Sequence, residues 1–172
     1  MEKEKRMAVK TVIDAIGKIH PDSIIKQCET QGICEITLAA DAFFEVMTLL
    51  HEHKPFPFDM LTDILGIDRM PRTPRFDLVY LLLSTKNFTR LIVRMEIDEG
   101  QDVPSVSSIW HSADWAEREV FDLMGIPFSN HPNLQRILMW ENFEGHPLRK
   151  DFPLEGKDFD KPFDPTTIQD YC

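Results

Sequence analysis

Apolar and polar residues follow a helical period in two stretches of the first part of the chain. The period predicts one helix over residues 3–19, and a second that Asp41 caps and the prolines of "HEHKPFPF" end. The apolar stripes of these helices are predicted to hold Val9, Val12, Ile13, Ile16 and Ile19 in the first, and Phe43, Val46, Met47 and Leu50 in the second. Each stripe needs an apolar surface to cover it, and a sheet can supply one.

Five other segments have the alternation of β-strands. "SIIKQCE" and "ICEITLA" flank "TQG" and predict a hairpin, and three more strands are predicted over 58–67, 76–84 and 88–97. The last strand alternates most clearly, with Leu91, Val93, Met95 and Ile97 on one face and Arg90, Ile92, Arg94 and Glu96 on the other. The order helix–two strands–helix–three strands predicts a two-layer α+β domain, with helices on one face of a mostly antiparallel sheet.

From about residue 103 the character of the chain changes. One more helix is predicted over 108–124, and after Gly125 no periodic segment follows. The sequence therefore divides into an α+β domain over 1–125, which includes this helix, and an extended C-terminal segment over 126–172, which is expected to be either disordered or partner-binding. The apolar stripe of the helix is predicted to be Ile109, Ala113, Ala116, Val120 and Leu123.

The polar side of this last helix allows two interpretations. Asp114, Arg118 and Asp122 are each four residues apart, which predicts an exposed ladder of ion pairs. Trp110, Trp115 and Phe121 lie off the predicted apolar stripe, and large aromatic residues left on a surface indicate a contact site instead.

Composition and charge narrow the possible functions. The chain has 172 residues, a net charge of −10 and a pI near 5.0, which is unfavourable for nucleic-acid binding. The longest apolar run, "LVYLLL", is far shorter than the about 18–20 residues that a membrane span needs. The charged N-terminus has no apolar region after it, so we expect no secretory signal and a protein that stays where it is made.

The cysteines and histidines do not predict a metal site. The three cysteines form no C-x-x-C pair, and an iron–sulfur cluster needs about four thiolates. A hairpin turn centred on Gln31 would place Cys28 opposite Cys34, where two reduced thiols are expected rather than a disulfide. His51 and His53 are two residues apart and would not share a helix face.

A free-standing enzyme can be assembled from residue types alone. Glu117, Glu119 or Asp122 would act as acid or base, with His131 or His146 as its partner, and Arg149 would bind an anion. The chain has no nucleophile elbow, no H-E-x-x-H motif and no glycine-rich phosphate loop to support this interpretation.

Two runs near the C-terminus carry a more specific signal. "WAEREVFDLMGIPFSNHPNLQRIL" and "FEGHPLRKDFPLEG" together resemble the signature of the small hydrophilic peripheral-arm subunit of respiratory complex I, the C-type subunit of bacterial NADH:quinone oxidoreductases. The predicted order of helices and strands before them is also similar to that family's N-terminal domain. One departure is Gln135, where the family usually has a second arginine beside the one at Arg136.

The resemblance implies a subunit without a catalytic centre and without a cofactor of its own. In such a complex FMN, iron–sulfur clusters and quinone belong to other subunits, and this chain docks on the large quinone-site subunit near the iron–sulfur subunits. The complex pumps protons and lies at the bacterial inner membrane, with this subunit peripheral on the cytoplasmic side and joined to the membrane only through its partners. The partner interface implied by the matched positions comprises Trp115, Glu117, Arg118, Glu119, Asp122, Gly125, His131, Pro132, Arg136, His146, Pro147, Leu148, Arg149, Lys150 and Asp151.

Two questions stay open at this point. Membrane-bound [NiFe] hydrogenases and F420-type dehydrogenases use similar subunits, so the electron donor could differ from NADH. The C-terminal segment has no period that would bury its own phenylalanines, so residues from about Gly145 to Cys172 are expected to become ordered only on the partner, anchored by Arg149 and Lys150.

Overall fold

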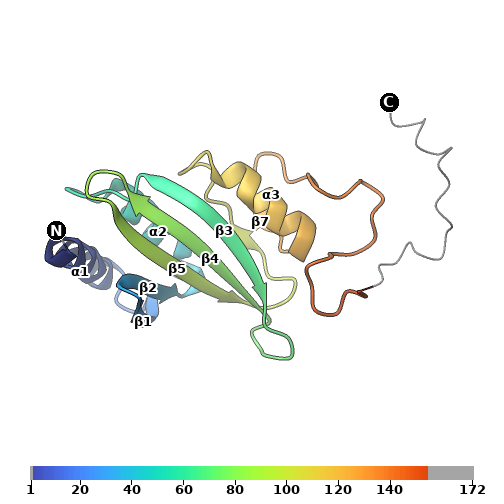
Figure 1. The fold of residues 1–172 in the computed structure, drawn as a ribbon, viewed down its shortest axis with the longest axis horizontal. Helices are drawn as coiled ribbons and strands as arrows, with labels where there is room; N and C mark the ends of the chain where they lie inside the picture. The colour runs from blue at the N-terminus through green and yellow to red at the C-terminus, as the bar shows by residue number, and fades with distance from the viewer. Residues whose placement is uncertain (1, 155–172) are drawn as a thin grey trace.

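The computed structural model of the protein describes residues 2–154, and Figure 1 shows the arrangement of its elements. A helix and a strand hairpin come first, a second helix and three long strands follow, and a third helix precedes the extended C-terminal segment. The elements are α1 (Glu2–Ile19), β1 (Ile24–Thr30), β2 (Ile33–Leu38), η1 (Ala40–Ala42), α2 (Phe43–Glu52), β3 (Met60–Asp68), β4 (Phe76–Ser84), β5 (Thr89–Ile97), β6 (Val103–Pro104), α3 (Ala113–Met124) and β7 (Phe128–Ser129).

The five long strands form one sheet in the order β1-β2-β5-β4-β3, which confirms the predicted α+β class and mostly antiparallel sheet. All neighbours are antiparallel except β2 and β5, which run parallel in the middle. The β1–β2 hairpin and the three-stranded unit of β3, β4 and β5 therefore meet through β2 and β5, which α2, β3 and β4 separate along the chain. A short second sheet pairs β6 with β7 and brings the segment after α3 back towards the domain.

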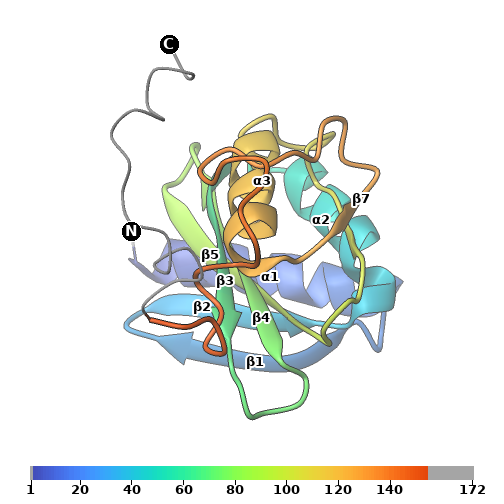
Figure 2. The same cartoon turned by 90° about the vertical axis from the view of Figure 1, so that its right-hand side faces the viewer.

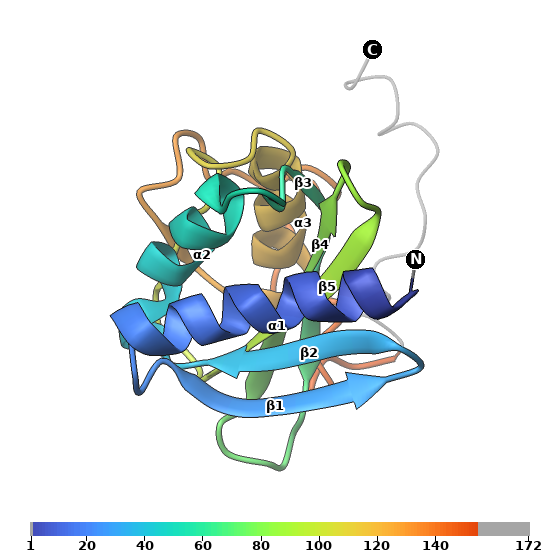
Figure 3. The same ribbon diagram turned by 90° about the vertical axis from the view of Figure 1, so that its left-hand side faces the viewer.

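The helices cover one face of the sheet, as the alternation in β5 predicts. Leu91, Val93, Met95 and Ile97 are buried on that face. Tyr80 of β4 packs against Phe43 of α2 with ring centroids 5.0 Å apart. A Cβ at Gly66 of β3 would touch Val120 and Met124, so α3 packs closely on β3. Figure 2 and Figure 3 show α1, α2 and α3 gathered on this side.

The hairpin register corrects the predicted position of the cysteines. Gln31 and Gly32 form the turn with φ of 53° and 80°, so it is centred between two residues rather than on Gln31. Cys28 then pairs with Glu35, and Cys34 pairs with Glu29. Because a shift of one residue reverses the face of a strand, the two thiols point to opposite sides of the sheet. Both are free.

Two predicted helix starts were wrong. Asp41 lies within η1, and α2 begins after Ala42 without a capping side chain. α3 begins at Ala113 rather than near residue 108, because the carbonyl of Val106 accepts from both Ile109 and Trp110 in a separate turn.

That turn also decides the place of Trp110. Its indole is only 4% exposed and donates to the carbonyl of Phe58, so it belongs to the core and not to a surface contact site. Within residues 2–154, none of the helices has both the length and the apolar character needed to cross a membrane.

Candidate partner-binding segment

The segment after α3 folds back along the polar side of that helix, as Figure 1 and Figure 2 show. The predicted exposed ion-pair ladder is therefore wrong. Asp122 is completely buried, and Arg118 donates to the carbonyl of Gln135 while its guanidinium lies 5.0 Å from the ring centre of Trp115. The helical period cannot reveal this burial, because the covering segment has no period of its own.

The carboxylate of Asp122 holds the first part of this segment in place. Three consecutive backbone N–H groups, from Ile137, Leu138 and Met139, donate to one carboxylate oxygen at 3.0, 2.8 and 2.9 Å. Arg136 donates to the other oxygen at 2.8 Å. Burial alone would raise the pKa of this carboxyl, but the three N–H donors and the guanidinium outweigh it and lower the pKa. Asp122 thus fixes residues 136–139 against the helix.

The second part of the segment caps the C-terminal end of α3. His146 Nδ1 lies 2.9 Å from the carbonyl of Asp122, and since a carbonyl only accepts, Nδ1 carries the proton. The backbone N–H of Leu148 donates to the carbonyl of Leu123 at 3.1 Å. Arg149 donates to the carbonyls of Met124 and Gly125 at 2.6 and 3.2 Å. The last carbonyls of a helix lack partners within it, and here a segment more than twenty residues later supplies them.

Gly125 makes this close approach possible. It ends α3 in the left-handed region with φ of 68°, and a Cβ there would lie closer than 3.0 Å to the His146 ring and to the Arg149 guanidinium. Glycine is needed both for the conformation and for the space.

Replacing Gly125 with alanine is expected to destabilise the chain by about 1–2 kcal/mol from backbone conformation alone, and to loosen residues 146–149. Chemical denaturation together with amide exchange would measure both effects. Gly17→Ala is the matched control, because nothing lies within 4 Å of a Cβ there and alanine favours a helix by about 1 kcal/mol. Equal stability of Gly125→Ala and wild type would contradict the packing described here.

Glu117 is a second buried carboxylate on α3. Its side chain is 0% exposed and accepts from the Ser105 hydroxyl at 2.6 Å and from the Val106 N–H at 2.7 Å. Burial raises its pKa to about 7, because the two donors do not restore the solvation of the charge and the nearby Asp114 carboxylate repels it. Glu117 joins α3 to the loop before it.

His131 completes this buried group from the other side. Its Nδ1 accepts from the N–H of Asn133 at 3.0 Å, and its Nε2 lies 3.1 Å from the carbonyl of Asp114. This arrangement places the proton on Nε2 of a neutral ring, 3.9 Å from the Glu117 carboxylate. The first His-Pro loop is therefore fixed to α3 through its histidine.

Residues 149–151 are also bound within the chain. Arg149 pairs with Glu99 at 2.7 Å, the N–H of Lys150 donates to Asp68 at 2.9 Å, and Asp151 pairs with Arg75 at 2.8 Å. Arg149 and Lys150, which the sequence predicts as anchors in a partner, thus also make contacts within the chain, and their role at a partner stays a prediction. Residues 155–172, which the expectation of order only on a partner also covered, lie outside the described residues.

The implied interface residues fall into two groups. Glu117, Arg118, Asp122, Gly125, His131, Arg136, His146, Pro147 and Arg149 are buried or half-buried. Trp115, Glu119, Pro132, Leu148, Lys150 and Asp151 are exposed. The first group holds the segment against the rest of the chain, and the second is accessible to another molecule.

Several large apolar side chains on α3 and on the segment after it are more than half exposed. Trp115 is 64% exposed, Leu148 59%, Leu138 55% and Trp140 53%. Trp140 was not predicted as a contact residue. The sequence feature that could have identified it is an aromatic residue in a stretch without helical or strand period, because such a stretch has no regular face that the core could cover.

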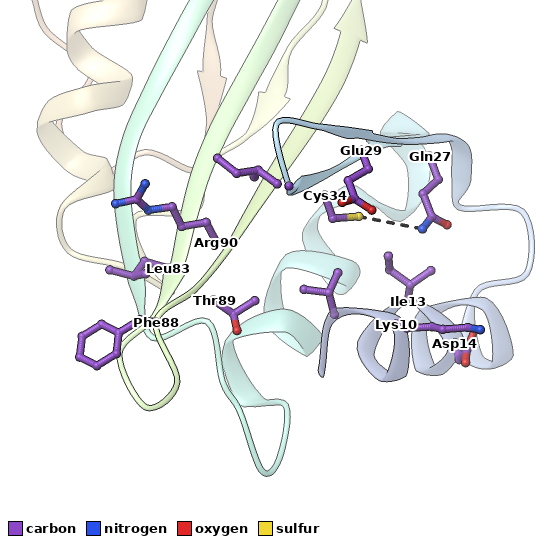
Figure 4. A pocket seen from close by; sticks show the side chains of 13 residues that line it. Lys10, Ile13, Asp14, Gln27, Glu29, Cys34, Leu83, Phe88, Thr89 and Arg90 are labelled. Atoms are coloured by element: carbon purple, nitrogen blue, oxygen red, sulfur yellow. Dashed lines mark hydrogen bonds between the residues drawn. The ribbon is translucent and has the colours of Figure 1, made fainter. Parts of the chain in front are cut away.

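A groove of about 690 Å³ lies elsewhere, between α1, the β1–β2 hairpin and the turn from β4 to β5 (Figure 4). Ile13, Cys34, Phe88 and Arg90 are among its walls, and none of the implied interface residues lines it. The acids and histidines of the enzymatic alternative do not face this groove. The structure uses Glu117, Asp122, His131 and His146 as internal hydrogen-bonding groups instead.

Proteins of a known family are similar in sequence to this chain over most of its length. Residues 36–158 match the family described as "Respiratory-chain NADH dehydrogenase, 30 Kd subunit". A Rhizobium meliloti protein, named as the second C-type subunit of NADH-quinone oxidoreductase, is 47% identical over 133 residues, covering 77% of this chain and 73% of the relative. The C-type subunit of the same enzyme from a Roseiflexus species is 38% identical over 149 residues, covering 86% of each chain.

Solved structures agree with the fold. A trypsin-resistant fragment of Nqo5 is 29% identical with a TM-score of 0.58, covering 78% of this chain and 100% of the fragment. A chain of an archaeal membrane-bound sulfane sulfur reductase has a TM-score of 0.70 at 22% identity, covering 86% of each chain, which shows the shared fold alone. The chain belongs to the 30 kDa subunit family of respiratory-chain NADH dehydrogenase, which includes the C-type subunits of NADH-quinone oxidoreductases.

Proposed function

We propose that this chain is a non-redox structural subunit of the peripheral arm of a proton-pumping NADH:quinone oxidoreductase. It docks on the large quinone-site subunit through α3 and residues 126–154. The observation that carries this proposal is that the buried polar groups of α3 and of the segment are hydrogen-bonded within the chain, while several large apolar side chains on the same surface stay more than half exposed: Trp115, Leu138, Trp140 and Leu148. Such a surface is preorganised and lacks only a partner.

The free energy of binding is more favourable when internal contacts already hold the backbone of the segment and exposed aromatic rings make the contact with the partner. The buried Asp122 and the half-buried Arg149 hold the backbone of the segment in one conformation, so less conformational entropy is lost when it binds. Exposed tryptophans supply the apolar area that dominates binding energy at the centre of interfaces. Trp115 presents its ring with Arg118 stacked on it, an arrangement suited to burial against another chain.

The choice of partner rests on a fused relative. A Sulfurihydrogenibium protein, named as the C/D subunit of NADH-quinone oxidoreductase, is 42% identical over 139 residues, which cover only 24% of that protein. Its name joins two subunits in one polypeptide, which favours a place for the C-like part beside the D part. We assign the D-type subunit as the large quinone-site partner of this chain, with iron–sulfur subunits nearby.

The proposal places every redox group in other subunits. Three cysteines are fewer than the about four thiolates that an iron–sulfur cluster needs. Within the described part of the chain, no three His, Cys, Asp or Glu side chains are grouped to hold a metal ion. FMN, the clusters and quinone would belong to the partners, and the chain would sit on the cytoplasmic side of the membrane through them.

Coexpression of the full chain with the D-type subunit of its own organism would test this function. A stable one-to-one complex is expected, and Trp115→Ala is expected to weaken it by about 2 kcal/mol, roughly 30-fold in the dissociation constant. Phe88→Ala is the matched control, since Phe88 is an aromatic residue 69% exposed beside the groove and away from α3. Failure of wild type to bind, or equal effects of the two substitutions, would contradict the proposal.

Purification of the native complex would test the electron donor. A flavin-bearing NADH-oxidising subunit is expected to copurify with the chain. A nickel–iron subunit or an F420-type subunit in its place would show that the donor is not NADH.

A further inference from the structure

Residues 145–151, which we name the strap, are held by side chains that lie far earlier in the sequence. Asp68 at the end of β3, Arg75 before β4 and Glu99 after β5 form one charged cluster beside the strap. Each of the last three strap residues contacts it: Arg149 through Glu99, Lys150 through Asp68 and Asp151 through Arg75. None of the three cluster residues belongs to the two signature runs.

Arg75 lies at the centre of this cluster. Its Nε and Nη2 donate to the two carboxylate oxygens of Asp68 at 3.2 and 2.8 Å, its Nη1 donates to Glu99 at 2.8 Å, and its Nη2 also reaches Asp151. The side chain is only 13% exposed, and its guanidinium lies 4.9 Å from the ring centre of Phe76. A two-point contact of this kind fixes the direction of a guanidinium as well as its position.

Asp68 holds Arg75 from a buried position. Its side chain is 2% exposed, and it also accepts the N–H groups of Met70 and Lys150 at 2.9 Å each. Burial opposes ionisation, but these donors and Arg75 lower the pKa of the carboxyl well below its usual range. The carboxylate therefore stays charged and joins the β3–β4 loop directly to the backbone of the strap.

We propose that Arg75, held by Asp68, is a positioning residue for the partner-binding segment. By bridging Asp68, Glu99 and Asp151 it fixes the strap on the end of the sheet, and so sets how Leu148 is presented. This inference rests on the proposed docking function for its consequence, but the strap contact itself can be tested in the isolated chain.

Arg75 holds the strap in place because its positive charge offsets the repulsion between the carboxylates around it. Glu99 accepts from both Arg75 and Arg149, so the two arginines share one carboxylate. Without Arg75, three carboxylates, those of Asp68, Glu99 and Asp151, would face one another near the strap. Their repulsion would favour release of residues 149–151, and the contacts of the strap with α3 would then be those of His146, Leu148 and Arg149.

Amide exchange on the full 172-residue chain would test the strap contact, comparing Arg75→Gln with wild type. The amides of Leu148 and Lys150 are expected to exchange at least tenfold faster in the variant, with β4 and β5 unchanged. Arg72→Gln is the matched control, because Arg72 lies in the same loop and pairs with Glu96 on an exposed surface. Arg75→Lys should restore part of the protection, which a general loss of packing would not allow.

Asp151→Asn serves as a second variant, since it removes one contact on an exposed side chain and spares the Asp68–Arg75 pair. It should speed exchange in the strap less than Arg75→Gln does. Unchanged exchange at Leu148 and Lys150 in both variants would overturn the proposal. So would acceleration spread evenly over the sheet.

Association with the D-type subunit separates this inference from the proposed function. Arg75→Gln is expected to slow association at least fivefold while Arg72→Gln has no effect. If wild type does not bind, the docking function fails and the exchange result still decides the strap contact. If wild type and Arg75→Gln bind alike while exchange differs, the positioning role is overturned.

Discussion

Replacing Asp122 with alanine is expected to destabilise the isolated chain by about 3–5 kcal/mol, the range found when one partner of a buried ion pair is removed. The substitution leaves Arg136 without its carboxylate and removes the acceptor of three backbone N–H groups. Residues 136–139 should separate from α3 and expose Trp140 further. Urea denaturation at pH 7, together with tryptophan fluorescence, would measure both effects.

Glu119→Ala is the control for this prediction, because Glu119 has the same charge on the same helix but is exposed. It should change stability by no more than about 0.5 kcal/mol. The contribution of Asp122 to the free energy of unfolding should also depend on pH. Because its pKa is lowered in the folded chain, this contribution is present above pH 3.8 and is lost as the pH falls below that value. Equal stability of the two variants at pH 7 would contradict the buried contact.

The second large effect is expected at Glu117 and has the opposite sign. The unfolded chain releases this proton near pH 4.5, whereas the folded chain keeps it until about pH 7. Because the pKa is raised by folding, the free energy of unfolding falls as pH rises between these values, by about 3 kcal/mol at 1.36 kcal/mol per unit. Glu117→Gln resembles the neutral form and should be more stable than wild type by up to about 3 kcal/mol at pH 8.

Denaturation curves at several pH values would test this, with Glu119→Gln as the control on the exposed side of the helix. Near pH 4.5 the Glu117→Gln variant and wild type should have equal stability. The difference should grow through neutral pH and then level off. A constant difference at all pH values would show that folding does not raise the pKa of Glu117.

The elements of the sheet were predictable because local period follows local burial. In β5 every second residue is buried, and the helical stripes of α1 and α2 contain the core residues Val12, Ile16, Phe43 and Leu50. The parallel contact between β2 and β5 was not predictable in this way. Which strand lies beside which depends on packing between distant segments, and the alternation within each strand is the same for either choice.

The burial of charged residues on α3 could have been found only in part. Ala113, Glu117, Val120 and Met124 follow core spacing, so a shift of the predicted apolar stripe would have placed Glu117 among apolar neighbours. Asp122 gives no such sign, since it lies on the opposite side under a segment without period. The family resemblance marked both residues as important but assigned them to a partner, whereas the structure shows contacts within the chain.

The capping of α3 by residues 146–149 has a consequence for the order in which the protein matures. A ribosome makes the chain from its N-terminus, so the sheet strands and α3 are complete before Leu148 and Arg149 exist. Until then the carbonyls of Leu123 and Met124 have no partner from this loop, and the end of the helix can fray. The proposed docking surface would thus be finished last, and an incomplete nascent chain would not yet present it to other subunits.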